Sequence, residues 1–319
     1  MMETVTFATQ SIWTWWFAIY LFLGGMGAAS ISLAIYTDLF LKPHKTLVLW
    51  GVIGGVLMLN IGSMILFIHL LHHAAVLVLF TPFAVLNQPS AWIAWGTQFI
   101  MWVQIAGLLY ALPYVRESPF WLDFPIAGRV VQSAPFGRVV DFARRYRRLM
   151  AWVAVLSGFG TAAYTGLLLQ SFPAVTLWHN PAVPILFTVS AFSTALAYLM
   201  LVMILFIRNH EDHALQVMFE RTDVLLLAME LFILYVLFHF TLSGSESGYR
   251  SATLLWESPL WLIGFICLGL LLPFLVELQS VLKGWSGKAP MVVACILILN
   301  GGYILRHMFM YSGVYAFPW

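Results

Sequence analysis

The stretch that decides the fold is SIWTWWFAIYLFLGGMGAASISLAIYT, residues Ser11–Thr37, which runs for 27 residues without an Asp, Glu, Lys, Arg or His. The hydrocarbon core of a bilayer is about 30 Å thick and a helix rises about 1.5 Å per residue, so about 20 apolar residues can span it. Backbone polar groups in lipid must be satisfied inside the segment, and the period-two alternation of an outer-membrane barrel is absent. The stretch therefore predicts a transmembrane helix.

Seven further stretches of the sequence have the same character. The protein is 62% hydrophobic and only 9% charged, whereas soluble domains carry about 25% charged residues, so a soluble core is excluded. We predict an all-α polytopic membrane protein with eight transmembrane helices in one domain, residues 1–319, built as two four-helix bundles over about 11–171 and 183–311. The other predicted spans are Thr46–Ile68, Trp92–Val115, Met150–Ser171, Val183–Ile207, Thr222–Leu242, Pro259–Ser280 and Met291–Tyr311.

The basic residues orient these helices in the membrane. The connections after the first, third, fifth and seventh helices hold 13 of the 15 Lys and Arg residues, and those after the second, fourth and sixth hold only Arg250. Positive loops stay in the cytoplasm, so we expect both termini outside. The basic residues on the cytoplasmic side are Lys42, Lys45, Arg116, Arg129, Arg138, Arg144, Arg145, Arg147, Arg148, Arg208, Arg221, Lys283 and Lys288.

The predicted outer side is rich in tryptophan and holds one unusual loop. Nine of the 14 tryptophans fall at or beyond outer helix ends, which fits an interfacial belt that also contacts a partner protein or an amphipathic ligand. Leu70–Pro89 contains no Asp, Glu, Lys or Arg. Either the second helix overruns and bends at Pro82, or this segment is interfacial and buried under another subunit.

Polar residues inside the spans suggest several classes of site. A series of b-type haems needs histidine pairs at two depths, and no predicted helix has a histidine in its inner half. A single outer haem on His72 and His239 stays open, as does a secondary transporter, although the halves show no convincing repeat. The two cysteines, Cys267 and Cys295, are too few for an iron–sulfur cluster or a zinc cage, so we expect no metal site on this protein.

A quinone site is the third class. A quinone needs an apolar, aromatic cleft with a hydrogen-bond donor at each carbonyl, and its reduction needs protons. Tyr20 and Tyr164 lie at about the same depth in the outer half of their helices. The other candidates for this outer-half site are Trp13, Trp15, His69, His72 and Gln98.

At these residues the sequence resembles the NrfD-like membrane subunits, a family that includes the polysulfide reductase membrane anchor. The resemblance covers all eight helices, and its clearest stretches are Trp13–Gly25, Pro89–Gly96, Ala163–Leu169 with Leu177–Pro181, and Asn300–Arg306. It implies a haem-free anchor in a prokaryotic cytoplasmic membrane that binds menaquinol or a similar quinol near the outer face. It also implies a ferredoxin-like partner subunit carrying four [4Fe–4S] clusters and a molybdopterin catalytic subunit, with membrane lipid around the protein and no nucleic-acid partner.

The resemblance also assigns residues. Tyr164 occupies the place of a quinone-contacting tyrosine, and Tyr20 and Phe17 stand where the polysulfide reductase anchor has a histidine and an asparagine. Phenylalanine cannot replace an amide as a donor, so the headgroup contacts differ here. His69 or His72 would exchange the protons. We also expect a hydrophilic proton route from the cytoplasm, or alternatively helix-packing pairs such as Glu230 with Arg306. Its members would be Asp223, Glu230, Asn60, Gln104, Glu277 and Arg306.

Overall fold

The computed structural model describes residues 5–69, 73–118, 125–206, 213–283 and 287–318. Within these residues eight helices are long and apolar enough to cross a membrane, which confirms the predicted polytopic α-fold. The spans are α1 (Trp15–Tyr36) with a π-helical last turn η1 (Thr37–Leu41), α2 (Lys45–Ile68), α5 (Trp92–Glu117), α9 (Arg147–Gln170), α10 (Ala182–Phe206), α11 (His213–Gly244), η3 (Leu260–Leu271) continued by α13 (Leu272–Lys283), and α14 (Lys288–Tyr311).

Several helices extend beyond their apolar stretches at the basic end. The largest difference is α11, which begins at His213 and not at the predicted Thr222. Its first turns carry polar side chains because they lie outside the hydrocarbon layer. There the helix still forms its own backbone hydrogen bonds but does not need apolar side chains. Arg147 and Lys288 likewise begin helices although the sequence placed them in connections.

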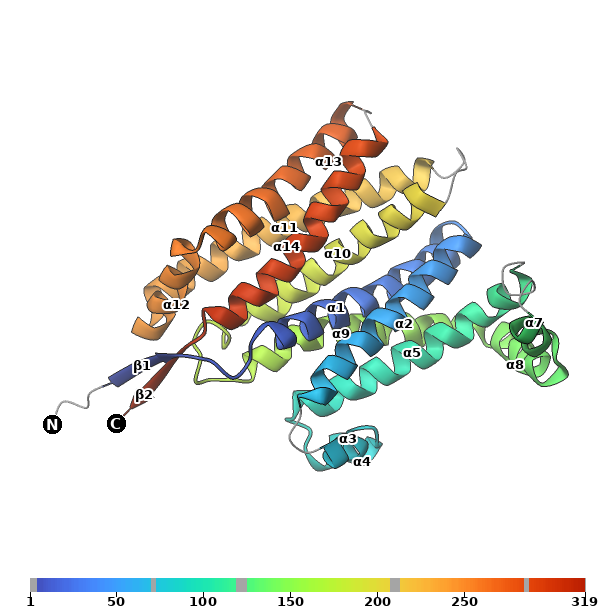
Figure 1. The fold of residues 1–319 in the computed structure, drawn as a ribbon, viewed down its shortest axis with the longest axis horizontal. Coiled ribbons are helices and arrows are strands. Elements are labelled where there is room, and N and C mark those ends of the chain that lie inside the picture. Colours follow the sequence, from blue (N-terminus) through green and yellow to red (C-terminus); the bar gives the residue numbers. More distant parts are fainter. Residues whose placement is uncertain (1–4, 70–72, 119–124, 207–212, 284–286, 319) are drawn as a thin grey trace.

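The spans pack as two groups of four (Figure 1). The first group holds α1, α2, α5 and α9, and the second holds α10, α11, η3–α13 and α14. The two groups meet where α1 and α9 pack against α10 and where α1 packs against α14. Glycines allow the closest approaches, because a β-carbon on Gly27 would meet the backbone of Gly55, and one on Gly269 would meet that of Gly301. Such small residues let membrane helices pack backbone to backbone.

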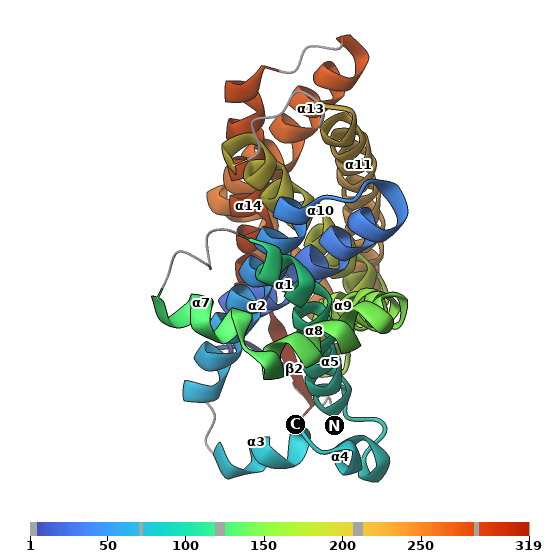
Figure 2. The same cartoon turned by 90° about the vertical axis from the view of Figure 1, so that its right-hand side faces the viewer.

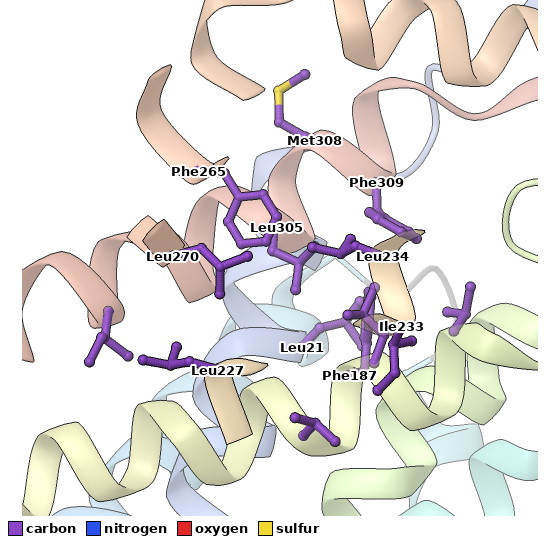
Figure 3. Packing of buried hydrophobic residues seen from close by; sticks show 14 of the residues in the cluster. Leu21, Phe187, Leu227, Ile233, Leu234, Phe265, Leu270, Leu305, Met308 and Phe309 are labelled. Atoms are coloured by element: carbon purple, nitrogen blue, oxygen red, sulfur yellow. The ribbon is translucent and has the colours of Figure 1, made fainter. Parts of the chain in front are cut away.

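The larger apolar core lies where the second group meets α1. Phe187 of α10, Leu227 of α11, Phe265 of η3 and Phe309 of α14 belong to this core, and Leu21 joins it from α1 (Figure 3). These five side chains are at most 1% exposed. Because α1 contributes to the core of the second group, the two groups are held against each other by the same packing that holds each together.

Shorter elements lie at the end that holds both termini. Strands β1 (Val5–Thr9) and β2 (Val314–Pro318) form a two-stranded antiparallel sheet there, which the all-α prediction did not include (Figure 1). Helix α12 (Glu246–Glu257) follows α11. Helices α3 (His73–Leu79) and α4 (Pro82–Asn87) lie between α2 and α5, so the expectation that the second helix overruns to Pro82 is wrong.

At the opposite end, helices α7 (Pro125–Gln132) and α8 (Ala134–Arg145) lie across the first group of spans (Figure 2). Nearby, a buried carboxylate joins three spans. Asp38 is 2% exposed and accepts hydrogen bonds from Tyr110 (2.6 Å) and Tyr114 (2.9 Å) of α5, while Arg147 of α9 lies 2.5 Å from it. Sequence reasoning did not single out Asp38, because a carboxylate just past an apolar stretch looks like a solvated helix end.

Candidate functional site

A cavity of about 750 Å³ opens at the end that holds the termini, which is the predicted outer end. It lies between the start of α1, the end of α2, the α3–α4 segment, the start of α5 and the end of α9. Its volume is in the range of small-molecule binding sites. The lining residues are Ile12, Trp13, Trp16, Phe17, Leu66, His69, Val76, Leu79, Ser90, Ala91, Trp92, Ile93, Leu168, Ser171 and Phe172.

One wall of this cavity is a stack of aromatic rings. Trp13 stacks on Phe17 with ring centroids 4.3 Å apart and on Trp178 at 5.5 Å, and Phe172 meets Trp13 edge-on. The indole of Trp178 donates a hydrogen bond to the carbonyl of Phe309 (2.8 Å), which fixes the stack to α14. The wall is therefore rigid before any ligand enters.

Gln10 fixes the entry of α1 into this wall. Its side-chain oxygen accepts from the backbone N–H of Trp13 (2.9 Å), and its amide nitrogen donates to the carbonyls of Trp13 (2.7 Å) and Met310. The residue is 7% exposed, so these bonds form away from water. Gln10 thus fixes the backbone at Trp13, directly before the N-cap residue Thr14 of α1.

His69, at the end of α2, is a polar residue of the cavity lining that can carry a proton. Its ring lies parallel to that of Trp16, with centroids 4.4 Å apart. Its Nδ1 lies 2.8 Å from the carbonyl oxygen of Ile65. A carbonyl can only accept, so Nδ1 carries the hydrogen, and Nε2 of the neutral ring is left as a hydrogen-bond acceptor.

Tyr20 and Tyr164 are brought together beneath the cavity. Their hydroxyl oxygens lie 3.1 Å apart, and the two residues are 3% and 1% exposed. Each lies about one helical turn deeper than a lining residue, Phe17 on α1 and Leu168 on α9, and neither tyrosine lines the cavity itself. The ring of Tyr164 packs so closely on Gly96 of α5 that any side chain at position 96 would overlap it.

The remaining predicted residues of this site are dispersed. Trp15 is 54% exposed and lines a separate hollow of about 130 Å³ that also contains His307. Gln98 donates to the carbonyls of Leu79 (3.0 Å) and Thr81 (3.2 Å), so it anchors the α3–α4 segment to α5. His72 lies outside the described residues, so neither its place in the site nor its pairing with His239 is described.

Helical spacing could have found the lining residues that sequence reasoning missed. Trp16, Phe17 and Tyr20 recur at intervals of three and four, which places them on one face of α1. Trp15 is two positions from Trp13 and faces another way, as its exposure shows. Counting the tryptophans at the outer helix ends does not reveal which face of a helix each one lies on.

A second set of polar residues forms a buried column in the other group of spans. Glu220, Asp223 and Glu230 lie on one face of α11, with Glu277 on α13 beside them, and all four are at most 3% exposed. Ser280 donates to Glu220 (2.9 Å). The four carboxyl oxygens of Asp223 and Glu277 have no hydrogen-bond partner among the described residues. The two groups and Glu230 are close enough to influence one another electrostatically.

Arg306 ends this column where α1, α10 and α14 meet. Its guanidinium donates to the carbonyls of Gly302 (2.7 Å) and Phe187 (3.2 Å) and to the hydroxyl of Ser190 (3.2 Å). Glu230 is buried on α11 and interacts electrostatically with Arg306. No ion pair or hydrogen bond joins Glu230 to Arg306 among the described residues, so the helix-packing pair that the sequence suggested stays a prediction.

Asn60 and Gln104 are not part of this column. Asn60 of α2 donates to Gln104 of α5 at 2.8 Å, on the flank of the first group of spans. Asn60 lines a lateral cavity of about 530 Å³ there. The expectation that these two residues join the carboxyl groups in one route is therefore wrong, because a shared depth in the membrane does not imply a shared position around the bundle.

Known proteins match this sequence along its whole length. The family model described as polysulphide reductase, NrfD, matches residues 4–318. Protein NrfD of Escherichia coli is 28% identical, with 98% of both proteins covered. A polysulfide reductase subunit of Wolinella succinogenes is 26% identical over 95% of this protein and 94% of its own length, and the NrfD homolog of Haemophilus influenzae is 22% identical over the same shares. The protein therefore belongs to the NrfD polysulphide reductase family, a family of multi-pass membrane subunits of respiratory oxidoreductases.

Proposed function

We propose that this protein is the quinol-handling anchor of an iron–sulfur/molybdopterin oxidoreductase, with its quinol site at the outer face of a bacterial cytoplasmic membrane. The observation that carries the proposal is the aromatic cavity with His69 on its wall and the Tyr20–Tyr164 pair one turn below it. A flat, apolar headgroup with polar oxygens matches aromatic walls that offer few polar groups. Bound menaquinol or a similar quinol would supply two electrons and two protons.

The side chains of the cavity have distinct roles in this proposal. Trp16 holds the imidazole of His69 in place, and Nε2 of that ring accepts a proton from a ligand hydroxyl or returns one. The bond between the Tyr20 and Tyr164 hydroxyls uses only one of their two hydrogens. The other hydrogen remains for a ligand oxygen that reaches the floor of the cavity between Phe17 and Leu168.

Electrons would leave toward a partner at the same end of the molecule. The α3–α4 segment beside the cavity presents Leu77, Phe83 and Leu86 to its surroundings, each at least 65% exposed. An apolar surface of this kind rimming a cavity is typical of a subunit interface. We assign the partner to a ferredoxin-like subunit with four [4Fe–4S] clusters, which passes electrons to a molybdopterin catalytic subunit.

Replacement of Tyr164 tests the quinol site. Tyr164→Phe removes one hydroxyl of the buried pair and keeps the ring that packs on Gly96. We expect quinol-linked activity of the purified complex to fall roughly tenfold, as for one lost hydrogen bond to a ligand, while activity with a reduced viologen dye stays unchanged. Tyr235→Phe, on a lipid-facing tyrosine that is 70% exposed, is the matched control. Unchanged quinol-linked activity in Tyr164→Phe would reject the assignment, whereas equal loss of both activities would point to misassembly instead.

The buried carboxyl column supports a second candidate function, proton movement from the cytoplasmic end. Glu220, Asp223, Glu277 and Glu230 follow one another over about three turns of α11 with at most 3% exposure. Asp223 and Glu277 have no hydrogen-bond partner among the described residues for their carboxyl oxygens, so either group is available to accept a proton. Buried acids arranged in series within a membrane are typical of proton relays. The single-outer-haem and secondary-transporter alternatives gain no supporting contact from this arrangement.

A further inference from the structure

Helices α7 and α8 differ from every span in their direction. They run across the end of the first group of spans, at the end opposite the termini (Figure 2). Helix α8 ends at Arg145, and the membrane-spanning helix α9 begins at Arg147, with only Tyr146 between them. This direct connection places the end of α8 at the level where the hydrocarbon layer begins.

One face of α8 is fixed to the protein. Gly137, Val140 and Ala143 recur every third residue and are buried. The guanidinium of Arg116 from α5 lies against Gly137, at 3.0 Å from the position a β-carbon would take. Arg144 pairs with Glu117 of α5 at 3.0 Å. These contacts determine which face of α8 points outward.

The outward face carries an apolar stripe that no described residue covers. Val139, Phe142 and Tyr146 lie at helical spacing three and four and are 43%, 48% and 40% exposed. The rings of Phe142 and Tyr146 lie 4.8 Å apart and form one surface. Such a stripe, on a helix too short and too polar to span a bilayer, is typical of a helix that lies in the membrane interface.

A row of arginines runs along one edge of this stripe. Arg138 and Arg145 are seven residues apart, two turns of α8, and both are exposed. The guanidinium of Arg145 lies 5.8 Å from the ring of Tyr146, at the border of the stripe. Among the described residues neither arginine is paired with a carboxylate, and Asp141 is the one acidic residue of α8. The pair of cations beside an apolar stripe is complementary to a phosphate headgroup above acyl chains.

We propose that α8 lies in the interface of the cytoplasmic leaflet and binds anionic phospholipid. Arg138 and Arg145 bind the headgroup phosphate, and Val139, Phe142 and Tyr146 enter the layer at the start of the acyl chains. The direct connection to α9 indicates that the partner of the apolar stripe is lipid and not a soluble protein. The next exposed apolar side chains along the sequence already belong to a membrane span; they are Leu149 (55%) and Trp152 (49%).

The first test measures the lipid preference of the full-length protein. Purified protein is reconstituted into nanodiscs of phosphatidylcholine with about 20% phosphatidylglycerol, an anionic share that gives the surface a clear negative potential. The phosphatidylglycerol that stays bound is then measured by native mass spectrometry. We expect the double variant Arg138→Gln/Arg145→Gln to retain at least about fivefold less of it. Arg250→Gln, at the opposite end, should leave retention unchanged. Unchanged retention in the double variant would overturn the proposal, as would loss of the bound lipid to millimolar inorganic phosphate.

The second test measures where the stripe lies. Phe142→Cys, in a background with Cys267 and Cys295 replaced by serine and alanine, is labelled with a fluorescent probe in the same nanodiscs. We expect quenching by a nitroxide on the lipid chains near the headgroup and protection from iodide in the water. Strong quenching by iodide, or protection that arises only when the other subunits of the complex are added, would instead identify an aqueous surface or a protein-docking surface and reject the lipid site.

Discussion

The contact between Gly96 and Tyr164 allows the Tyr20–Tyr164 pair to be disturbed without altering either tyrosine. A β-carbon at position 96 would overlap three atoms of the Tyr164 ring. In Gly96→Ala either the ring or α5 must therefore move, and the 3.1 Å contact between the two hydroxyls is lost. Overpacking of this kind costs about 1–3 kcal/mol. If the whole of this free energy is lost from the positioning of the Tyr164 hydroxyl, quinol-linked activity should fall by roughly 5-fold to 160-fold.

The assay compares two activities of the purified complex and one property of the isolated subunit. Gly96→Ala should lower quinol-linked turnover and leave dye-linked turnover intact, with a small loss of thermal stability in detergent. Gly24→Ala is the matched control, since Gly24 is also buried in a span but a β-carbon there would meet nothing within 4 Å. This control should keep full activity and gain up to about 1 kcal/mol of stability from the stiffer helix backbone.

The outcomes separate the reasoning from its alternatives. Wild-type quinol kinetics in Gly96→Ala, together with a measurable loss of stability, would show that the displaced Tyr164 has no part in quinol turnover. Equal loss of quinol-linked and dye-linked turnover would show that the subunit interface, and not the cavity, responds to the change.

Three further changes test other parts of the structure. Asp38→Ala should destabilise the protein by about 2 kcal/mol in thermal unfolding. This is less than the loss expected for a fully buried ion pair, because the partner Arg147 is 39% exposed and can bind water instead. The control Asp141→Ala removes an exposed carboxylate and should change the stability little. Gly301→Val should force η3 and α14 apart at Gly269, because the two helices contact each other there through backbone atoms. We expect a loss of more than about 3 kcal/mol, the upper end of ordinary overpacking. Wild-type stability of this variant would refute the close approach of the two helices. Glu277→Gln should abolish proton uptake by proteoliposomes while leaving dye-linked turnover unchanged, and normal uptake would remove the carboxyl column from proton movement.

The sequence predicted the spans and the depth of their residues, which depend on the bilayer. It did not predict which residues are neighbours around the bundle. Lengths and hydropathy identified all eight spans, because a lipid environment imposes the same requirement on each. The depth of Tyr20 and Tyr164 could likewise be predicted. Depth alone also grouped Asn60 with Glu230, although the two lie in different groups of spans. Neighbours around a bundle depend on which helices pack together, and a single sequence does not encode that in a local pattern.

The buried ion pair of Asp38 and Arg147 is a second example, in which the sequence analysis missed a cluster that the structure contains. Asp38 is a single acidic residue at the end of an apolar stretch, where most carboxylates face water. It is buried because Tyr110, Tyr114 and Arg147 converge on it from positions 72, 76 and 109 residues away in the sequence. Only the packed structure brings those donors together, so no spacing rule within α1 could predict the network.

Arg306 lies between the proposed quinol site and the carboxyl column, so its charge affects how proton movement in the column could influence the quinol site. Its Nη2 lies 3.7 Å from the place a β-carbon on Gly25 would take, and Thr165, the neighbour of Tyr164, lies 4.0 Å from that place. A guanidinium stays protonated in proteins and repels a passing proton, so a continuous proton wire from Glu230 to the cavity would have to avoid it. A proton that reached Glu230 would instead neutralise the acidic group that interacts with Arg306. The unbalanced positive charge would then favour negative charge near Tyr164, so that the proposed quinol site and proton route would be coupled through an electric field without exchange of protons between them.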